Sequence, residues 1–201
     1  MSARLAHLLS AGNVLDLDAL CVTPHASCWH LHLDVVVLCD DGAVLDVALV
    51  AALGALGTTA LPALYLSHTG RLQALEGAGA APPMDGQALA FTARQLALCS
   101  IPASLTCGLY DGHVLMDPSR EEEALMKATV CCCWCRAYGG AAAAQSPVLA
   151  VHKAGGEACA SVKTLLRCVA ASQGRQGEVV RALAAAGARI HGHVNGTAAA
   201  M

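Results

Sequence analysis

The sequence is short of charged and aromatic side chains. Asp, Glu, Lys and Arg make up 13% of its 201 residues, and Phe, Trp and Tyr make up 3%. The charged share is about half of the quarter that is usual for globular domains. Because 56% of the residues are hydrophobic, the composition excludes an intrinsically disordered chain. Such a surface, poor in charge, is expected to be hidden in part against partners.

Basic residues are also scarce. Lys and Arg total 12 against 15 Asp and Glu, so the net charge is −3 and the pI about 6.3. A protein that holds a nucleic acid alone normally shows a clustered positive face. The scattered charges exclude that class, and neighbouring proteins would have to supply most of the positive field.

Long apolar runs are missing as well. No run reaches the ~18 residues that a membrane helix needs, since the longest candidate, residues 43–56, contains Asp46. Residues 1–10 lack the sustained apolar stretch of a secretory signal. The 11 cysteines, an odd number, are therefore expected to be buried free thiols. We expect no membrane association.

Hydrophobic periodicity predicts an α+β layer fold. Two helices are expected to pack on a sheet: an all-round apolar helix over 43–56 that Gly57 ends, and a long amphipathic helix over 159–186 that Gly187 ends. A short helix is expected at 3–10, and a capping box at Ser119–Glu122 starts a single helical turn. Strands are expected over 29–38, 62–67, 101–109, 114–116, 128–136 and 147–152, with a hairpin turn at 110–113.

Several short motifs follow one another along the chain. They are Cys28-Trp29-His30-Leu31-His32-Leu33-Asp34, Asp41-Gly42, Leu45-Asp46-Val47-Ala48, Ala51-Ala52-Leu53, Leu61-Pro62, Ile101-Pro102, Met116-Asp117-Pro118-Ser119, Glu121-Glu122-Glu123 and Lys153-Ala154-Gly155-Gly156. In this order and spacing they resemble the RNase PH-like ring subunits of the eukaryotic RNA exosome. The resemblance implies an RNase PH-like fold (ribosomal protein S5 domain 2-like), a sheet with packed helices.

The resemblance also implies that the domain is N-terminally incomplete, because members of the family carry strands and a helix before the point where this chain begins. Residues 1–190 are expected to form the partial domain, with insertions near 70–90 and 137–146 and a disordered tail at 191–201. An incomplete sheet would expose an edge and apolar faces.

The active-site motif of the family is degenerate here. Active RNase PH-type enzymes carry an Asp followed by Gly-Gly-Thr-Arg, and the resemblance implies that the Arg and the helix start hold anionic groups. In this chain Asp41 and Gly42 remain, whereas Leu45 stands in place of the Arg. Asp46 adds a negative charge near a site that must accept anions. We therefore expect no catalytic residue, and interpret Asp41 as a turn residue and Asp46 as a favourable charge at a helix start.

Other candidate sites are weaker. The cysteines of Cys131-Cys132-Cys133-Trp134-Cys135 lie on one expected strand without a second pair, which favours buried thiols over zinc. His30 and His32 share a strand face, but a partly exposed face explains them without a metal. Gly155-Gly156 lacks phosphate-loop spacing and is interpreted as a turn. No cofactor or metal is expected. Four basic residues could contact RNA, although ordinary solvated roles are favoured: Arg4, Lys127, Arg136 and Lys153.

The resemblance implies a structural subunit that assembles with other RNase PH-like ring subunits and cap subunits. It would support 3′-to-5′ RNA degradation and ribosomal RNA processing in the nucleus, nucleolus and cytoplasm, binding RNA together with its neighbours. The RNA-binding residues are unknown. Two alternatives remain open: an active phosphorolytic 3′-5′ exoribonuclease, and a truncated product that does not assemble.

Overall fold

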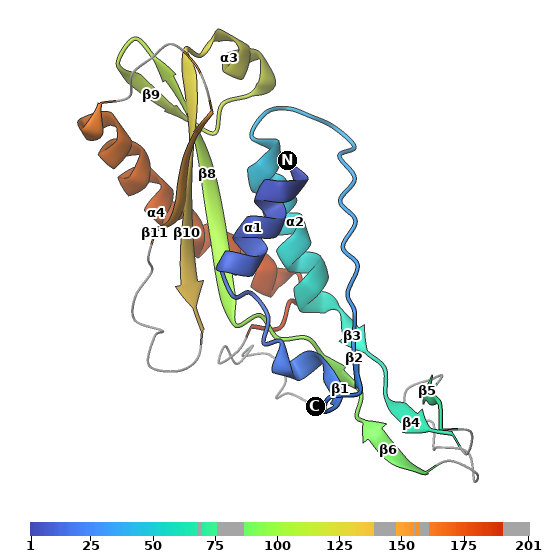
Figure 1. The fold of residues 1–201 in the computed structure, drawn as a ribbon. Helices are drawn as coiled ribbons and strands as arrows, with labels where there is room; N and C mark the ends of the chain where they lie inside the picture. Colours follow the sequence, from blue (N-terminus) through green and yellow to red (C-terminus); the bar gives the residue numbers. More distant parts are fainter. Residues whose placement is uncertain (68–69, 76–86, 139–147, 155, 157–160, 191–201) are drawn as a thin grey trace, which may run out of the picture.

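The largest sheet has four antiparallel strands, which are β8 (Ser100–Tyr110), β9 (His113–Met116), β10 (Ala128–Ala137) and β11 (Val148–Ala154). Their order across the sheet is β11-β10-β8-β9. The computed structural model describes residues 1–67, 70–75, 87–138, 148–154, 156 and 161–190. Within these, the α+β class and the hairpin between β8 and β9 are confirmed (Figure 1).

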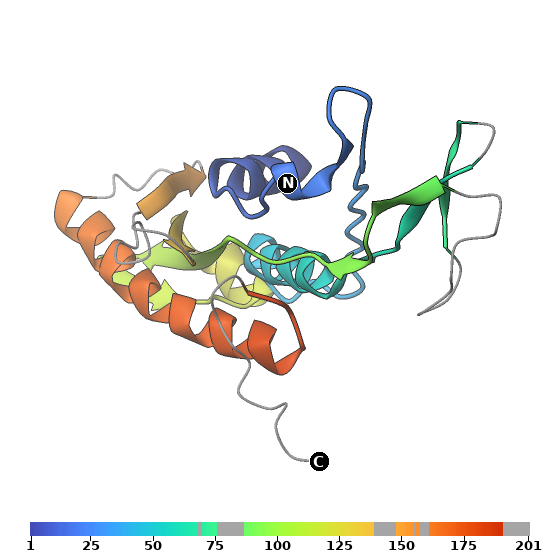
Figure 2. The same cartoon turned by 90° about the horizontal axis from the view of Figure 1, so that it is seen from below.

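Helices cover both faces of this sheet (Figure 2). The long helix α4 (Val162–Ala185) lies on one face, and α1 (Ser2–Ala11) lies on the other. The alternation of strand β10 sorts its side chains between them. Val130 and Cys132 pack in a cluster with Cys168 of α4, whereas Cys131 and Cys133 line a cavity of about 330 Å³ beside α1. A strand covered on both sides is apolar in both directions, as this one is.

The main core forms where α1, β8, the C-terminal half of α4 and the helix α2 (Val44–Thr58) meet. Leu49 and Leu53 of α2 and Ile101 of β8 are fully buried there. The side chain of Ser161 accepts a hydrogen bond from the Thr164 amide and caps α4. Gly187, with φ at +79°, follows its end as predicted.

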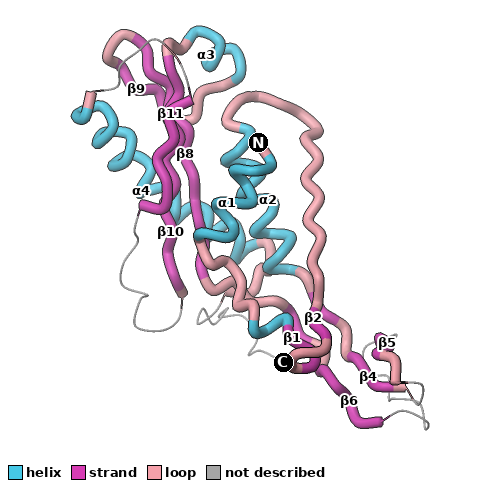
Figure 3. The backbone as a smooth tube through the Cα atoms, viewed as in Figure 1, coloured by secondary structure: helices cyan, strands magenta, loops and turns pink. Residues whose placement is uncertain are grey.

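Short strands form the opposite end of the molecule (Figure 3). After the 3₁₀ turn η1 (Asp18–Leu20), they pair as three small antiparallel sheets with a separate core of Leu61, Leu64, Phe91 and Leu96. The Trp29 and Phe91 rings pack edge to face, with their centroids 6.2 Å apart. The strands are β1 (Cys21–Thr23), β2 (Ser27–Cys28), β3 (Ala60–Leu61), β4 (Leu64–Leu66), β5 (Leu72–Ala74), β6 (Gln87–Phe91) and β7 (Arg94–Gln95).

The strand predicted over 29–38 is wrong. After β2 the chain runs extended past α2 (Figure 1), but no backbone group of residues 30–39 bonds to the backbone of another described residue. The reason is physical: a strand needs a neighbour to complete its hydrogen bonds, and none of the described strands pairs with this segment. Val36 is 76% exposed and Leu38 is 95% exposed.

Helix α2 departs from its prediction at two points. It is not buried all round, because Val47 is 64% exposed. It also continues through Gly57 to Thr58, so Gly57 is not its cap. Gly57 instead packs against the segment after α4, where a Cβ would lie 2.7 Å from the Cβ of Ala188. The glycine is required by this close approach rather than by a turn.

Some predictions fall outside the described residues. The tail at 191–201, most of the insertion at 137–146 and the centre of the insertion at 70–90 belong to this group. The described flanks of the 70–90 insertion are the short strands β5 and β6, which both pair with β4. The capping box at Ser119 is confirmed and starts α3 (Arg120–Leu125).

Candidate functional site

The degenerate motif lies in the tight loop that enters α2. Gly42 and Ala43 both have positive φ, at +89° and +45°, and the Gly42 amide donates to Oδ1 of Asp40 at 3.2 Å. A Cβ on Gly42 would overlap the carbonyl oxygen of Pro118 and lie 2.7 Å from the carbonyl carbon of Ser119. Only glycine fits here, because the loop is pressed against the start of α3.

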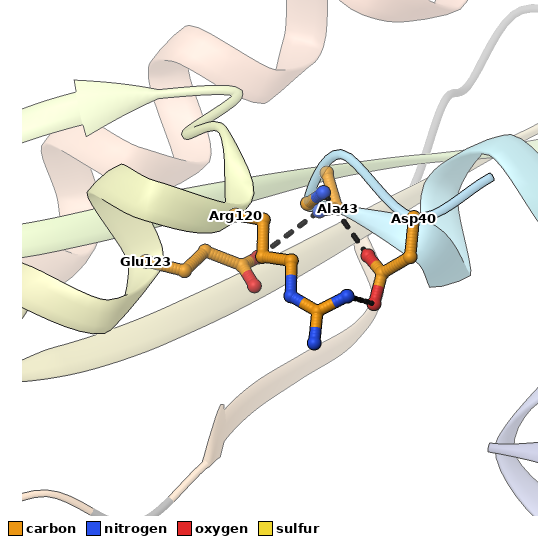
Figure 4. Close-up of polar contacts among 5 residues, drawn as sticks. Asp40, Ala43, Arg120 and Glu123 are labelled. Atoms are coloured by element: carbon orange, nitrogen blue, oxygen red, sulfur yellow. Dashed lines mark hydrogen bonds and ion pairs between the residues drawn. The ribbon is translucent and has the colours of Figure 1, made fainter.

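A carboxylate from helix α3 accepts a hydrogen bond at the start of α2. The Ala43 amide, at the N-cap of α2, donates to Oε1 of Glu123 at 3.0 Å. Beside it, the Arg120 guanidinium lies 3.3 Å from the Asp40 carboxylate (Figure 4). A helix N-terminus attracts anions because its first amides lack partners and its dipole is positive there. In this chain Glu123 supplies that anion from within.

The four motif residues do not form one site. Asp41 and Gly42 border a groove of about 470 Å³ between residues 35–39 and α2. Leu45 points elsewhere, since it lines the smaller cavity beside α1. Asp46 is buried, and its Oδ2 accepts the Thr106 amide of β8 at 2.6 Å. An acid, a glycine and a leucine placed this way hold no common ligand.

Asp46 lies at the start of α2 as predicted, and it also makes a contact with the sheet that was not predicted. It lies in the first turn of α2, where the helix dipole favours a negative charge. Its side chain, however, turns into the sheet, and its Oδ1 lies 3.8 Å from the Cys131 thiol. Asp46 therefore ties α2 to β8 and β10, and its charge does not face a ligand at the helix start.

The cysteine tract is made of protonated thiols. Desolvation by burial raises the pKa of Cys132 to about 11, and desolvation together with the nearby Asp46 carboxylate raises the pKa of Cys131 to about 12. Burial also raises the pKa of Cys133 and Cys135. Thiolates, not thiols, bind metals and attack electrophiles. No group of three or more metal-ligating side chains occurs among the described residues.

The remaining candidates are engaged in ordinary contacts. The exposed rings of His30 and His32 lie 4.5 Å apart without a third ligand in the described chain. A guanidinium nitrogen of Arg4 lies 2.7 Å from Nε2 of His152, and Lys127 forms an ion pair with Asp111. Arg136 lies over the Tyr138 ring at 5.7 Å, and Lys153 approaches the carbonyl oxygen of Gly156 at 3.5 Å. Gly156 has φ at +82°, as a turn residue does, while Gly155 lies outside the described residues.

Glu123 and Arg120 are the functional residues that sequence reasoning missed. The signal was the acidic run at 121–123 directly after the Ser119 cap. A capping box assigns Glu122 to the start of its own helix, and that assignment is correct. Periodicity within six residues, however, does not tell which other helix Glu123 will reach.

Comparisons with known proteins agree with this architecture. Residues 100–131 match the profile of the 3′ exoribonuclease family, domain 2. Exosome complex component Rrp42 of Methanosarcina acetivorans is 31% identical over 111 residues, which are 55% of this chain and 34% of that protein. Exosome complex component rrp43 of Schizosaccharomyces pombe is 28% identical over 125 residues, covering 62% of this chain and 42% of that one.

Solved structures show the same fold. The archaeal exosome core matches with a TM-score of 0.66 at 20% identity, over 90% of this chain and 61% of that one. The Archaeoglobus fulgidus exosome with RNA bound to its active site matches with a TM-score of 0.62, over 90% and 59%. The RNase PH-like fold and the predicted resemblance to exosome subunits are therefore confirmed, although the chain spans about a third of the length of the first curated relatives. No described helix is long and apolar enough to cross a membrane.

Proposed function

We propose that this chain is a non-catalytic structural subunit of an RNA exosome ring. It assembles with other RNase PH-like subunits and with cap subunits, and it supports 3′-to-5′ RNA degradation and ribosomal RNA processing in the nucleus, nucleolus and cytoplasm. Leu20-Cys21 and Asp117-Pro118-Ser119 resemble most the exosome component eight group, the ribosomal-RNA-processing protein forty-three. The fission yeast match supports that assignment.

One observation carries the non-catalytic role. The start of α2, where the resemblance implies that active enzymes hold anionic groups, already receives the Glu123 carboxylate. A phosphate there would meet this like charge and would have no guanidinium, because Leu45 replaces the Arg. Asp41 keeps the family acid, but an acid without an anion holder cannot complete phosphorolysis.

The exposed apolar surface supports assembly. The groove between residues 35–39 and α2 is lined mainly by valine, leucine and alanine side chains, and Leu38 at its edge is almost fully exposed. Contiguous apolar surface of this kind marks a contact with another protein. The unbonded extended backbone beside it would accept a strand. A ring subunit has neighbours that can cover both.

Affinity purification of the tagged chain from cells tests assembly. We expect the other ring subunits at near-equal amounts. A Val36→Asp/Leu38→Asp variant should lose them, because two charges cannot be buried at an apolar contact without partners. The matched control is Leu17→Asp, an equally apolar and 75% exposed residue outside the groove, which should retain the subunits. Recovery of the unaltered chain alone, or with chaperones, would instead favour the non-assembling product.

A phosphorolysis assay separates the scaffold from the enzyme. The purified chain and its complex are incubated with a 3′-labelled RNA and inorganic phosphate, and released nucleoside diphosphate is measured. We expect no phosphate-dependent release that depends on this chain, so Asp41→Asn should leave the rate of the complex unchanged. Phosphate-dependent release that Asp41→Asn abolishes would establish the active exoribonuclease instead.

A further inference from the structure

Positive charge is concentrated on helix α4. The helix carries the basic residues Lys163, Arg167, Arg175 and Arg181 and a single acid, Glu178. The rest of the chain holds eight basic residues and fourteen acidic ones. Helix α4 is therefore positively charged although the whole protein has a net charge of −3.

Three of these charges share one face. At 100° per residue, Lys163, Arg167 and Arg181 fall within about 40° of one another, opposite the buried face of α4. That buried face consists of Cys168, Ser172, Gln176, Val179 and Leu183. The three basic side chains are exposed and make no ion pair in the described chain. The one acid of the helix is already paired, because Glu178 lies 3.0 Å from Arg175.

The middle of this face is bare backbone. Gly174 and Gly177 lie between Arg167 and Arg181, and a Cβ on either would meet nothing within 4 Å. Glycine inside a helix is destabilising relative to alanine, and here neither packing nor a positive φ requires it. Flanked by cations, these glycines leave room for a ligand to approach the helix backbone closely.

The spacing suits an extended polyanion. With a rise of 1.5 Å per residue, Lys163 and Arg167 are about 6 Å apart along the axis, and Arg181 follows about 21 Å further on. A row of unpaired cations with this reach binds a run of phosphates rather than one small anion. Figure 2 shows α4 along the edge of the molecule. Because the buried residues of α4 lie on the opposite side of the helix, the basic side is turned away from the core.

We propose that the outer face of α4, formed by Lys163, Arg167, Gly174, Gly177 and Arg181, binds the phosphate backbone of single-stranded RNA. The choice of RNA among polyanions rests on the proposed function, since an exosome subunit meets RNA. The surface contains no aromatic side chain, so binding would read charge and not base identity. A protein partner at this face is the competing occupant, and the test separates the two.

The test measures binding of a fluorescent 20-nucleotide poly(U) RNA to the full chain as a function of salt. Each phosphate contact to a single strand contributes about 0.7 to the slope of log affinity against log salt. Lys163→Gln/Arg167→Gln should lower the slope by about 1.4 and weaken binding at least tenfold. Arg71→Gln/Arg189→Gln removes the same charge at exposed positions outside α4 and should change the affinity less than twofold. Equal losses in the two double variants, or no binding by the unaltered chain, would overturn the proposal.

A second variant tests close approach without altering charge. Gly174→Gln/Gly177→Gln places side chains in open space, so the fold should be retained by circular dichroism while RNA affinity falls several-fold. Unchanged affinity would contradict the role of the glycines. Capture of ring subunits is measured in parallel. If the α4 variants lose subunits but bind RNA normally, a protein occupies this face, and the proposal fails while the ring assignment stands. If RNA binding depends on α4 but no subunit is captured, the ring assignment fails alone.

Discussion

The four-stranded sheet and the segment over 30–39 carry the same kinds of apolar side chain, but the segment is far more exposed. Ile101 and Val130 of the sheet are fully buried, whereas Leu38 of the segment is 95% exposed. The sheet strands have bonded neighbours and helices on both faces, whereas residues 30–39 make no backbone hydrogen bond to another described residue and have α2 along one side. Hydrophobicity thus predicts which residues favour burial, but burial itself depends on a neighbouring element.

The largest expected contrast is between two leucines of these regions. Leu53→Ala removes a fully buried side chain from the main core and should lower the free energy of unfolding by about 3 kcal/mol. Leu38→Ala should change it by less than about 0.5 kcal/mol in the free chain. Urea unfolding followed by circular dichroism measures both. A loss at Leu38 as large as that at Leu53 would mean that the segment is buried in solution.

The next contrast concerns two glycines with positive φ. Gly42→Ala combines the unfavourable φ with a collision against Pro118 and Ser119, and should cost about 2–3 kcal/mol. Gly112→Ala has a similar φ of +80° but open space around the new Cβ, so about 1 kcal/mol is expected. Thermal unfolding compares the two variants. Equal losses would show that α3 does not press on the loop.

Alkaline pH should lower the free energy of unfolding, because the buried thiol of Cys132 in β10 resists ionisation in the folded protein. Desolvation raises the pKa of Cys132 to about 11 in the folded protein, whereas an unfolded thiol ionises near 8.5. A raised folded pKa contributes stability that is present below the unfolded pKa and is lost as pH rises toward the folded one. The free energy of unfolding should therefore fall by about 1.4 kcal/mol per pH unit for this thiol between roughly pH 9 and 11.

The control for this pH effect is an exposed cysteine. Cys132→Ala should reduce the slope by about 1.4 kcal/mol per pH unit, while the other thiols of the tract keep their share. Cys21→Ala, at an exposed position, should leave the slope unchanged. Denaturant titrations at pH 8 and pH 10 provide the comparison. If Cys132→Ala keeps the full slope of the unaltered protein, the Cys132 thiol does not contribute to the pH dependence.

The smallest expected effect is at the closed start of α2. Glu123→Gln keeps an oxygen that can accept the Ala43 amide but removes the charge, and should cost about 0.7 kcal/mol. Glu121→Gln is the matched control, because it removes an exposed charge from the same turn of α3 without touching α2. Similar losses in both would indicate that only the dipole of α3 is affected.

Local signals were predictable and relationships between distant elements were not. The capping box at Ser119, the hairpin at 110–113 and the end of α4 at Gly187 depend on a few adjacent residues, and all three were predicted correctly. The alternation over 29–38 was interpreted as a strand, because a pattern describes the side chains and not the presence of a bonding neighbour.

The candidate site shows the same limit. The loss of the Arg at Leu45 is visible in the sequence, but the pairing of Glu123 with Ala43 joins residues 80 positions apart. The positive face of α4 was also hidden, since its charges recur at multiples of a helical turn and vanish in a whole-chain total. Only the fold brings either arrangement together.

Hydrogen–deuterium exchange of residues 30–39, in the free chain and in the assembled ring, tests the central claim most directly. Amides without partners exchange quickly, and amides in a paired strand are protected. We predict rapid exchange in the free chain and strong protection in the ring, while β8 and β10 are protected in both. Rapid exchange of residues 30–39 within an intact ring would contradict the account, because the exposed segment would then have no neighbour to cover it.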